Sequence, residues 1–269
     1  MYTLKKSLGQ HFLRDENISR KIVQSVVEAH EKRKDGATPW NLLEVGPGAG
    51  ALTKYLLEIP DVQFRAVELD EEKVQYLGAT WPVLKDKIIH KSILDVERPF
   101  ESRFAVVGNF PYNISTQILF KMLDWKDYLE SITGMFQKEV ALRVAAKEGN
   151  KIYGVISVLI QAWFDVEYLF EVHEQCFNPP PKVKSAVIRL TPRKSLPDFR
   201  DEASFFQLVK AGFNQRRKTL KNAVRSLYEP AALEDAIFGQ RAEQLTIDDF
   251  AKLTWTMRPV TKKPKMDLE

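Results

Sequence analysis

A closely spaced run of glycines constrains this chain most. Residues 46–50 read Gly-Pro-Gly-Ala-Gly, follow the apolar run at 41–45, and precede apolar residues at helical spacing, Leu52, Tyr55 and Leu56. A buried strand that passes through such a turn into a helix is the first unit of open α/β sheets, whose ligands lie at the carboxyl ends of the strands. The pattern therefore predicts a Rossmann-like α/β domain with Gly46 and Gly48 at its binding site.

Two acidic residues follow further predicted strands. The apolar run at 64–67 ends on Glu68, about 20 residues after the glycine turn, where such folds place an acid that binds ribose hydroxyls. The run at 88–90 leads to Asp95, which we expect at the same edge, accepting a hydrogen bond from an adenine amino group. Each carboxylate, taken alone, fits equally well a solvated strand end or a turn.

The glycine turn also indicates which nucleotide it serves. The spacing is G-x-G-x-G rather than the G-x-G-x-x-G of dinucleotide sites, and Pro47 has no N–H for a pyrophosphate. Glu44 is expected to place a negative charge just before the turn. An anionic dinucleotide fits such a site poorly, so the pattern favours S-adenosylmethionine with its cationic sulfonium.

The residues Asn109, Phe110, Pro111 and Tyr112 form a polar, proline-stiffened corner after the apolar run at 104–107. The amino group of adenine is a poor nucleophile because its lone pair is delocalised, and two hydrogen-bond acceptors can localise it. The Asn109 side chain and the Phe110 carbonyl are suited to this, since Pro111 restricts Phe110 to extended conformations. Tyr112 could stack on an unstacked base. An ordinary strand-to-loop turn would show the same residue types.

Together with other segments in the same order, these motifs resemble the small-subunit ribosomal RNA adenine dimethyltransferases. The matching segments are residues 7–13, 44–50, 67–70, 95, 109–115, 137–141, 177–185 and 213–220. The resemblance implies an S-adenosylmethionine-dependent methyltransferase with a Rossmann-like α/β domain and a small C-terminal helical domain. It also implies dimethylation of two adjacent adenosines in the 3′-terminal hairpin of 16S rRNA, within an immature 30S subunit.

The resemblance assigns roles to individual residues. Cofactor contacts fall on His11, Leu13, Gly46, Gly48, Glu68, Asp95 and Asn109. Tyr112 matches the aromatic residue that stacks on the target base, and Phe177 matches a second one that closes the pocket. The chain departs from the commoner family pattern twice, with Phe110 in place of Leu and His11 in place of Asn. A neutral imidazole and an amide present different donors and acceptors.

The positive charge is concentrated near the end of the chain. Of 40 Lys+Arg and 36 Asp+Glu, residues 193–269 contain 15 and 11, so this segment carries the whole net charge of +4. A proline-marked linker at 190–197 follows a predicted strand at 185–190. We therefore expect a methyltransferase domain at 1–192 and a small, basic, RNA-binding helical domain at 193–269.

Basic residues flank a predicted helix of the second domain. Phe213, Leu220, Val224 and Leu227 are expected on one apolar stripe. The neighbouring cations are Arg216, Arg217, Lys218, Lys221 and Arg225. A charged helix flank is usually only solvated, but this density favours contacts with RNA phosphates. Lys5, Lys6 and Arg14 are expected to extend the basic track, and a flexible tail is expected from Arg258 onward.

Other features exclude several classes of protein. The single cysteine, Cys176, rules out an intrachain disulfide and is expected to be a buried filler. The four histidines have no partners at ligand spacing, so no metal site is expected. No apolar run approaches the length of a membrane span, and no leader sequence precedes the first motif. We expect a cytoplasmic monomer.

Three alternatives remain open. Adenine methyltransferases of large-subunit rRNA that confer macrolide resistance have a similar corner and glycine turn, although residues 213–220 favour the small-subunit enzymes. A DNA adenine methyltransferase could use the same corner, but no target-recognition domain is evident. The protein could also act mainly as an assembly or quality-control factor that binds immature small subunits.

Overall fold

The computed structural model describes residues 11–32 and 40–259, which form two compact units. The first unit comprises Met1–Ala141 and Val166–Pro192, and the second comprises Leu142–Asp165 and Arg193–Glu269. The larger segment of the second unit begins after Pro192, within the stretch where the sequence predicted a proline-marked linker. Residues 142–165, which the sequence assigned to the first domain, belong to the second unit.

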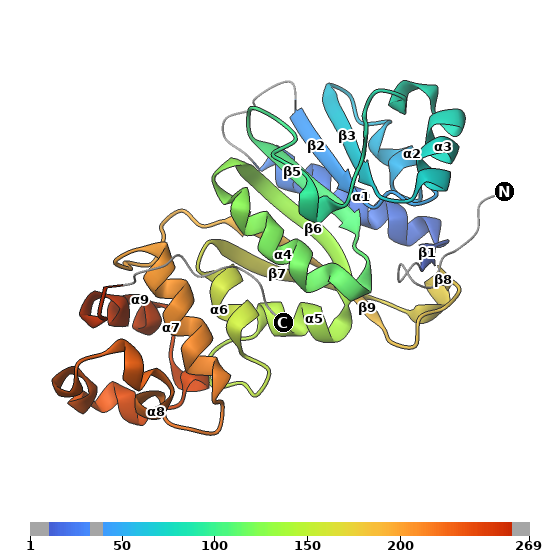
Figure 1. Cartoon of the computed structure of the whole chain (residues 1–269). Helices are drawn as coiled ribbons and strands as arrows, with labels where there is room; N and C mark the ends of the chain where they lie inside the picture. Colours follow the sequence, from blue (N-terminus) through green and yellow to red (C-terminus); the bar gives the residue numbers. More distant parts are fainter. Residues whose placement is uncertain (1–10, 33–39, 260–269) are drawn as a thin grey trace. The chain divides into compact units, whose positions relative to one another are not determined.

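A seven-stranded sheet forms the centre of the first unit (Figure 1). Its strands, in spatial order, are β4 (Ile88–His90), β3 (Val62–Glu68), β2 (Trp40–Val45), β5 (Phe104–Asn109), β6 (Leu129–Gln137), β9 (Ser185–Pro192) and β7 (Phe164–Val172). The pairs from β4 to β6 are parallel, whereas β9 is antiparallel to β6. All six residues of β2 are buried, as expected for a parallel strand covered on both faces.

The strand order places a ligand site between β2 and β5. After β2 the chain adds β3 and β4 on one side, and it then adds β5 and β6 on the other. Such a reversal opens a crevice at the carboxyl ends of the strands on either side of it. The glycine turn after β2 and the corner after β5 therefore meet at this crevice.

The helices of the first unit are α1 (Glu16–Glu31), α2 (Thr53–Leu56), α3 (Glu71–Thr80), α4 (Ser115–Asp124) and the start of α5 (Lys138–Ala145). In Figure 1, α4 lies in front of the sheet and α1 passes behind it. Asp15 and Asp70 cap α1 and α3 by accepting backbone hydrogen bonds from Ile18 and Glu72. The caps fix where these helices begin, next to the predicted site.

A small two-stranded sheet fixes the position of Phe12 and Leu13. Strand β1 (Phe12–Leu13) pairs antiparallel with β8 (Phe177–Asn178), with Phe12 opposite Asn178 and Leu13 opposite Phe177. The backbone N–H groups of Arg14 and Asp15 donate to the Cys176 carbonyl at 2.9 and 3.3 Å. Cys176 itself is half-buried, and its Sγ lies 3.6 Å from Asp15 Oδ2. Residues far apart in sequence are thus joined beside the crevice.

The second unit contains α6 (Val155–Gln161), α7 (Glu202–Asn214), α8 (Leu220–Val224) and α9 (Ile247–Leu253). The single helix expected across Phe213 to Leu227 is wrong, because α7 ends at Asn214 and a turn separates it from α8. The Lys218 N–H donates to the Gln215 carbonyl at 2.8 Å, and the Leu220 N–H donates to Gln240 at 2.7 Å. The local turn bond and the tertiary bond to Gln240 reverse the chain, while Phe213, Leu220 and Val224 all stay buried.

None of the helices in the described ranges combines the length and apolar character needed to cross a bilayer. Within the same residues, no cluster of three or more histidine, cysteine or carboxylate side chains has the arrangement of a metal site.

Candidate active site

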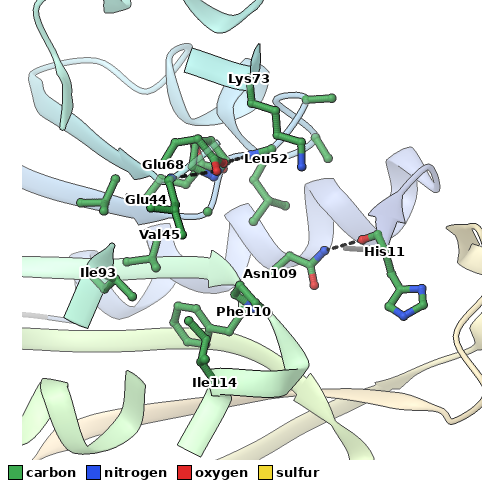
Figure 2. A pocket seen from close by; sticks show the side chains of 18 of the residues that line it. His11, Glu44, Val45, Leu52, Glu68, Lys73, Ile93, Asn109, Phe110 and Ile114 are labelled. Carbon is green, nitrogen blue, oxygen red and sulfur yellow. Dashed lines mark hydrogen bonds between the residues drawn. The ribbon is translucent and has the colours of Figure 1, made fainter. Parts of the chain in front are cut away.

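A cavity of about 230 Å³ lies at the carboxyl ends of β2, β3 and β5 (Figure 2). Nine of the predicted site residues line it, namely His11, Leu13, Gly46, Gly48, Glu68, Asn109, Phe110, Pro111 and Tyr112. The site thus contains the glycine turn, the acid after β3 and the corner after β5, which are widely separated in sequence. The topology alone accounts for this convergence.

The glycine turn has a conformation that other residues adopt only with strain. Gly46, Gly48 and Gly50 have φ angles of +67°, +59° and +83°. These values fall in the left-handed region, which costs residues with a Cβ about 1 kcal/mol or more. At Gly50 a Cβ would also collide with the ring of Trp81. The backbone can therefore curve closely around a ligand at this point.

Backbone donors fix the Glu68 carboxylate. Its Oε2 accepts from the Gly48 N–H at 3.1 Å, and its Oε1 accepts from the N–H groups of Leu69 and Asp70, both at 2.9 Å. A carboxylate offers about four acceptor directions, so three bonds leave capacity for a further donor from the cavity. The arrangement can hold a hydroxyl group of a ligand.

Glu44 differs from the expectation that it carries a negative charge. Its side chain is 1% exposed, lines the cavity and accepts a hydrogen bond from Thr53 Oγ1 at 2.7 Å. Burial, together with the nearby Glu68 carboxylate, raises the pKa of Glu44 to about 8. The expected charge is therefore wrong for this structure at neutral pH, where most of the Glu44 carboxyl is protonated. Among the described residues, the other carboxylate and lysine side chains that line the cavity are Glu68, Lys73 and Lys91.

The raised pKa of Glu44 predicts how stability depends on pH. The folded protein retains a proton that the unfolded chain releases near pH 4.5, so the free energy of unfolding falls as pH rises from about 5 to 8. Relative to Glu44→Gln, which keeps an acceptor for Thr53, the decline should approach 1.4 kcal/mol per pH unit, on the order of one proton's linkage. Urea unfolding at several pH values measures it.

The exposed Glu58 provides the control for this experiment. Glu58→Gln should follow the wild-type dependence on pH, because it leaves the buried carboxyl in place. Parallel stability curves for the wild type and Glu44→Gln would contradict the assignment of a retained proton to Glu44.

Asn109 is the last residue of β5, and its amide has a defined orientation. Nδ2 donates to the backbone carbonyl of His11 at 3.1 Å. The amide oxygen is then left on the cavity side, as Figure 2 shows. The side chain therefore presents an acceptor to the cavity. The hydrogen bond to the His11 carbonyl fixes this orientation of the amide.

Phe110 packs its side chain against two glycines that face each other across β5 and β6. Gly108 and Gly134 are register partners, and a Cβ on either would collide with the Phe110 ring. The ring is 1% exposed and meets Phe136 edge-on, with centroids 5.0 Å apart. The Phe side chain thus acts in packing, while its carbonyl remains at the corner. The sequence analysis did not single out these two glycines, although glycine inside a strand often marks the close approach of another group.

Tyr112 is anchored through its hydroxyl. The Tyr112 Oη and the Oγ of Ser185, a fully buried residue of β9, share a hydrogen bond. Burial raises the pKa of Tyr112, so its hydroxyl stays protonated at neutral pH. The His11 imidazole lies over the Tyr112 ring, with centroids 5.4 Å apart and an interplanar angle of 30°. Ser185 is a site residue that the sequence did not single out.

Two predicted residues do not line the cavity. Phe177 is fully buried in the core of the first unit, where β1 pairs with β8. Asp95 is exposed at the end of the short 3-10 helix η3 (Ile93–Asp95). Because β4 ends at His90, the residues of this segment at the cavity are Lys91, Ser92, Ile93 and Leu94 instead. Asp95 was predicted because a carboxylate can accept a hydrogen bond from an adenine amino group. Since β4 ends at His90, the chain instead brings Ser92 to this edge of the sheet.

The predicted basic residues fall into two groups in the second unit. Arg216 Nη2 donates to the carbonyls of Lys151 and Tyr153 at 2.8 and 2.7 Å, and Lys221 pairs with Glu234 at 2.9 Å. Arg217, Lys218 and Arg225 are exposed. Arg216, although it is also exposed, therefore holds a loop in place, whereas Arg217, Lys218 and Arg225 are available to meet a ligand. Lys5 and Lys6 lie outside the described residues.

Comparison with known proteins identifies close relatives. The chain is 50% identical over 255 residues to the ribosomal RNA small subunit methyltransferase A of Cytophaga hutchinsonii, covering 93% of this chain and 95% of that protein. It is 48% identical over 257 residues to the protein of the same name from Flavobacterium johnsoniae, covering 93% and 94%.

Solved structures show the same fold. A dimethyladenosine transferase from Plasmodium falciparum superposes with a TM-score of 0.74 at 22% identity, covering 90% of this chain and 96% of that one. The 23S rRNA methyltransferase ErmE gives 0.66 at 23% identity, covering 91% and 99%. The predicted Rossmann-like methyltransferase fold is thus confirmed.

The family assignment rests on nearly the whole chain. The model of the ribosomal RNA adenine dimethylase family matches residues 1–257, which include every motif at the cavity as well as the exposed cations of the second unit. The resemblance predicted from those motifs is confirmed, and this chain belongs to the ribosomal RNA adenine dimethylase family.

Proposed function

We propose that the protein transfers methyl groups from S-adenosylmethionine to N6 of two adjacent adenosines in the 3′-terminal hairpin of 16S rRNA. The observation that carries this is the Asn109 amide oxygen, which faces a cavity bounded by the glycine turn. The relatives at 48 and 50% identity are named as small-subunit rRNA methyltransferases, which favours this substrate over large-subunit rRNA. The substrate is an immature 30S subunit in the cytoplasm, and the protein acts as a monomer.

The residues at the cavity fit the proposed cofactor. Gly46 and Gly48 let the backbone approach it, and the fixed Glu68 carboxylate can accept from its ribose hydroxyls. Ile93 offers an apolar surface and Ser92 a hydroxyl after β4, and Leu13 adds a further apolar side chain to the lining. When bound, S-adenosylmethionine supplies a methyl group that is electrophilic because it is attached to a sulfonium.

The corner residues activate the amine of the target base. The Asn109 amide oxygen and the Phe110 carbonyl accept its two N–H hydrogens, which draws the lone pair back to nitrogen and directs it toward the methyl group. Tyr112 holds the base plane. The N6 proton becomes acidic once nitrogen is alkylated, so no general base with a shifted pKa is required. Position and electrostatics supply the catalysis.

The exposed cations of the second unit bind RNA phosphates in this proposal. Arg217, Lys218 and Arg225 are exposed, whereas Arg216 and Lys221 are engaged with protein atoms. Neutralising Arg217 and Lys218 to Gln should reduce the slope of log affinity against log salt by about 1.5, because each phosphate contact contributes about 0.7 to 0.9. Filter binding with rRNA at several salt concentrations measures the slope.

A matched control for the basic surface is available in the same unit. Lys194 and Lys252 are also exposed, and replacing both by Gln removes the same amount of charge. If the two double variants changed the slope equally, only net charge would matter and the proposed surface would be refuted.

Methyl transfer into purified subunits tests the whole proposal. The protein is incubated with labelled S-adenosylmethionine and, in separate reactions, with 30S subunits that lack the modification, with 50S subunits or with duplex DNA, and the nucleic acid is digested to nucleosides. The expected product is N6,N6-dimethyladenosine in 16S rRNA. Label confined to large-subunit rRNA, or to duplex DNA, would assign one of the alternative activities, and no label in any acceptor would refute methyl transfer.

A further inference from the structure

His11 contacts both parts of the corner. Its backbone carbonyl accepts the hydrogen bond from Asn109 Nδ2 at 3.1 Å. Its imidazole lies over the Tyr112 ring, and its Nδ1 is 2.9 Å from the Pro179 carbonyl oxygen. One residue thus orients the acceptor of the corner and covers its aromatic ring.

The pairing of β1 with β8 places His11 there. Phe12 lies opposite Asn178, so the next residue on each strand brings His11 beside Pro179. The hydrogen bond from the imidazole to the Pro179 carbonyl continues the ladder through a side chain. The position of the imidazole therefore follows from the register of these two short strands.

The imidazole occupies space that a stacked base requires. A base between two rings needs about 3.5 Å on each side, or about 7 Å between the rings in all. The centroids of His11 and Tyr112 are only 5.4 Å apart. A base therefore cannot enter between the two rings as they lie in this structure.

His11 is the side chain that can move. The Tyr112 hydroxyl is bonded to Ser185, which is 0% exposed, so both ends of the tyrosine are held. Within the described residues the half-buried imidazole makes one hydrogen bond, and it can rotate about its side-chain torsions without disturbing the carbonyl that binds Asn109. Rotation would uncover Tyr112 while Asn109 stays oriented.

We propose that the His11 imidazole is a stacking competitor on Tyr112, which the target adenine must displace, while the His11 backbone positions Asn109. This inference rests on the proposed function, and it assigns the side chain to the target base rather than to the cofactor. An unstacked base binds at Tyr112 only if it stacks on the tyrosine ring more strongly than the His11 imidazole does. A two-ring purine offers more overlap than a pyrimidine does.

Substitutions at His11 separate the competitor from the backbone role. His11→Ala and His11→Asn remove the ring but keep the carbonyl, so KM for the 30S substrate should fall about threefold to tenfold, the factor expected for loss of one aromatic pair. The turnover number kcat should stay within about twofold of wild type. His11→Phe keeps a stacking ring and should keep a KM near that of the wild type, as should Glu58→Ala, an exposed control outside the cavity lining.

Two further measurements complete the test. Titration calorimetry with S-adenosylmethionine should give wild-type affinity for His11→Ala, and a loss there would assign His11 to the cofactor and overturn the inference. In the free protein, a ring-labelled NMR spectrum should show upfield-shifted His11 signals that return to ordinary values in Tyr112→Ala. Ordinary shifts in the wild type would overturn the stacking itself.

The outcomes distinguish this inference from the proposed function. If no RNA accepts a methyl group, the proposed function fails, and the NMR comparison still reports on the ring pair. If 16S rRNA is methylated but KM is unchanged or raised in His11→Ala, the competitor role alone is refuted.

Discussion

Replacing Asn109 by Ala is expected to lower kcat for methyl transfer by at least about 100-fold, the loss typical of removing one preorganised polar group from a reacting centre. The substitution removes the amide oxygen that faces the cavity, so one N–H of the target amine loses its acceptor. Only one hydrogen bond to the His11 carbonyl is lost from the fold, a cost of about 1 kcal/mol. Steady-state methyl-transfer assays on 30S subunits give kcat, and urea unfolding gives stability.

Asn113 offers the matched control for Asn109. It lines the same cavity two residues beyond the proline but is exposed. Asn113→Ala should retain kcat within a few-fold of the wild type. Turnover by Asn109→Ala at a rate near that of Asn113→Ala would refute the role of the amide oxygen.

Gly134→Ala is expected to disturb the corner without touching the cavity. The added Cβ would lie 2.6 Å from the Phe136 ring and still closer to the Phe110 ring. Overpacking of this kind costs about 1 to 3 kcal/mol of stability, and displacement of Phe110 should move its carbonyl and lower kcat more than 10-fold. Urea unfolding and methyl-transfer assays measure the two effects.

A smaller residue at position 110 should relieve the collision. The double variant Gly134→Ala with Phe110→Leu should recover most of the lost kcat, so the two substitutions should be strongly non-additive. Gly78→Ala serves as the control, because no atom lies within 4 Å of its added Cβ in α3, and it should be neutral or stabilising. Simple additivity in the double variant would contradict the packing argument.

Local patterns were enough to predict the framework of the site. The strand at 88–90 and the strands before Glu68 and Asn109 follow from apolar runs, and parallel pairing brings their carboxyl ends together. The protonation of side chains and the identity of their neighbours could be obtained only from the three-dimensional structure. The protonation of Glu44 depends on how deeply β2 is buried, and the displacement of Asp95 depends on where β4 ends.

Other features depend on contacts between distant residues. The break between α7 and α8 depends on the Gln240 carbonyl, which lies outside the sequence window that suggested one helix. The orientation of Asn109 depends on a carbonyl 98 residues earlier in the chain. Periodicity reports on burial along one element, and it contains no information about such partners.

The sheet order also bears on the sequence of events during synthesis. Strand β9 lies between β6 and β7, although it is made after both. When translation has reached only β7, the nascent chain lacks β9. The edge of β6 is then unpaired, and β7 has no neighbouring strand in the sheet. The same nascent chain lacks Phe177 and Asn178, so β1 is unpaired and the His11 carbonyl is not yet positioned for Asn109. The catalytic corner is thus completed late in translation, and a chain released before residue 177 would have the motif of this enzyme without its geometry.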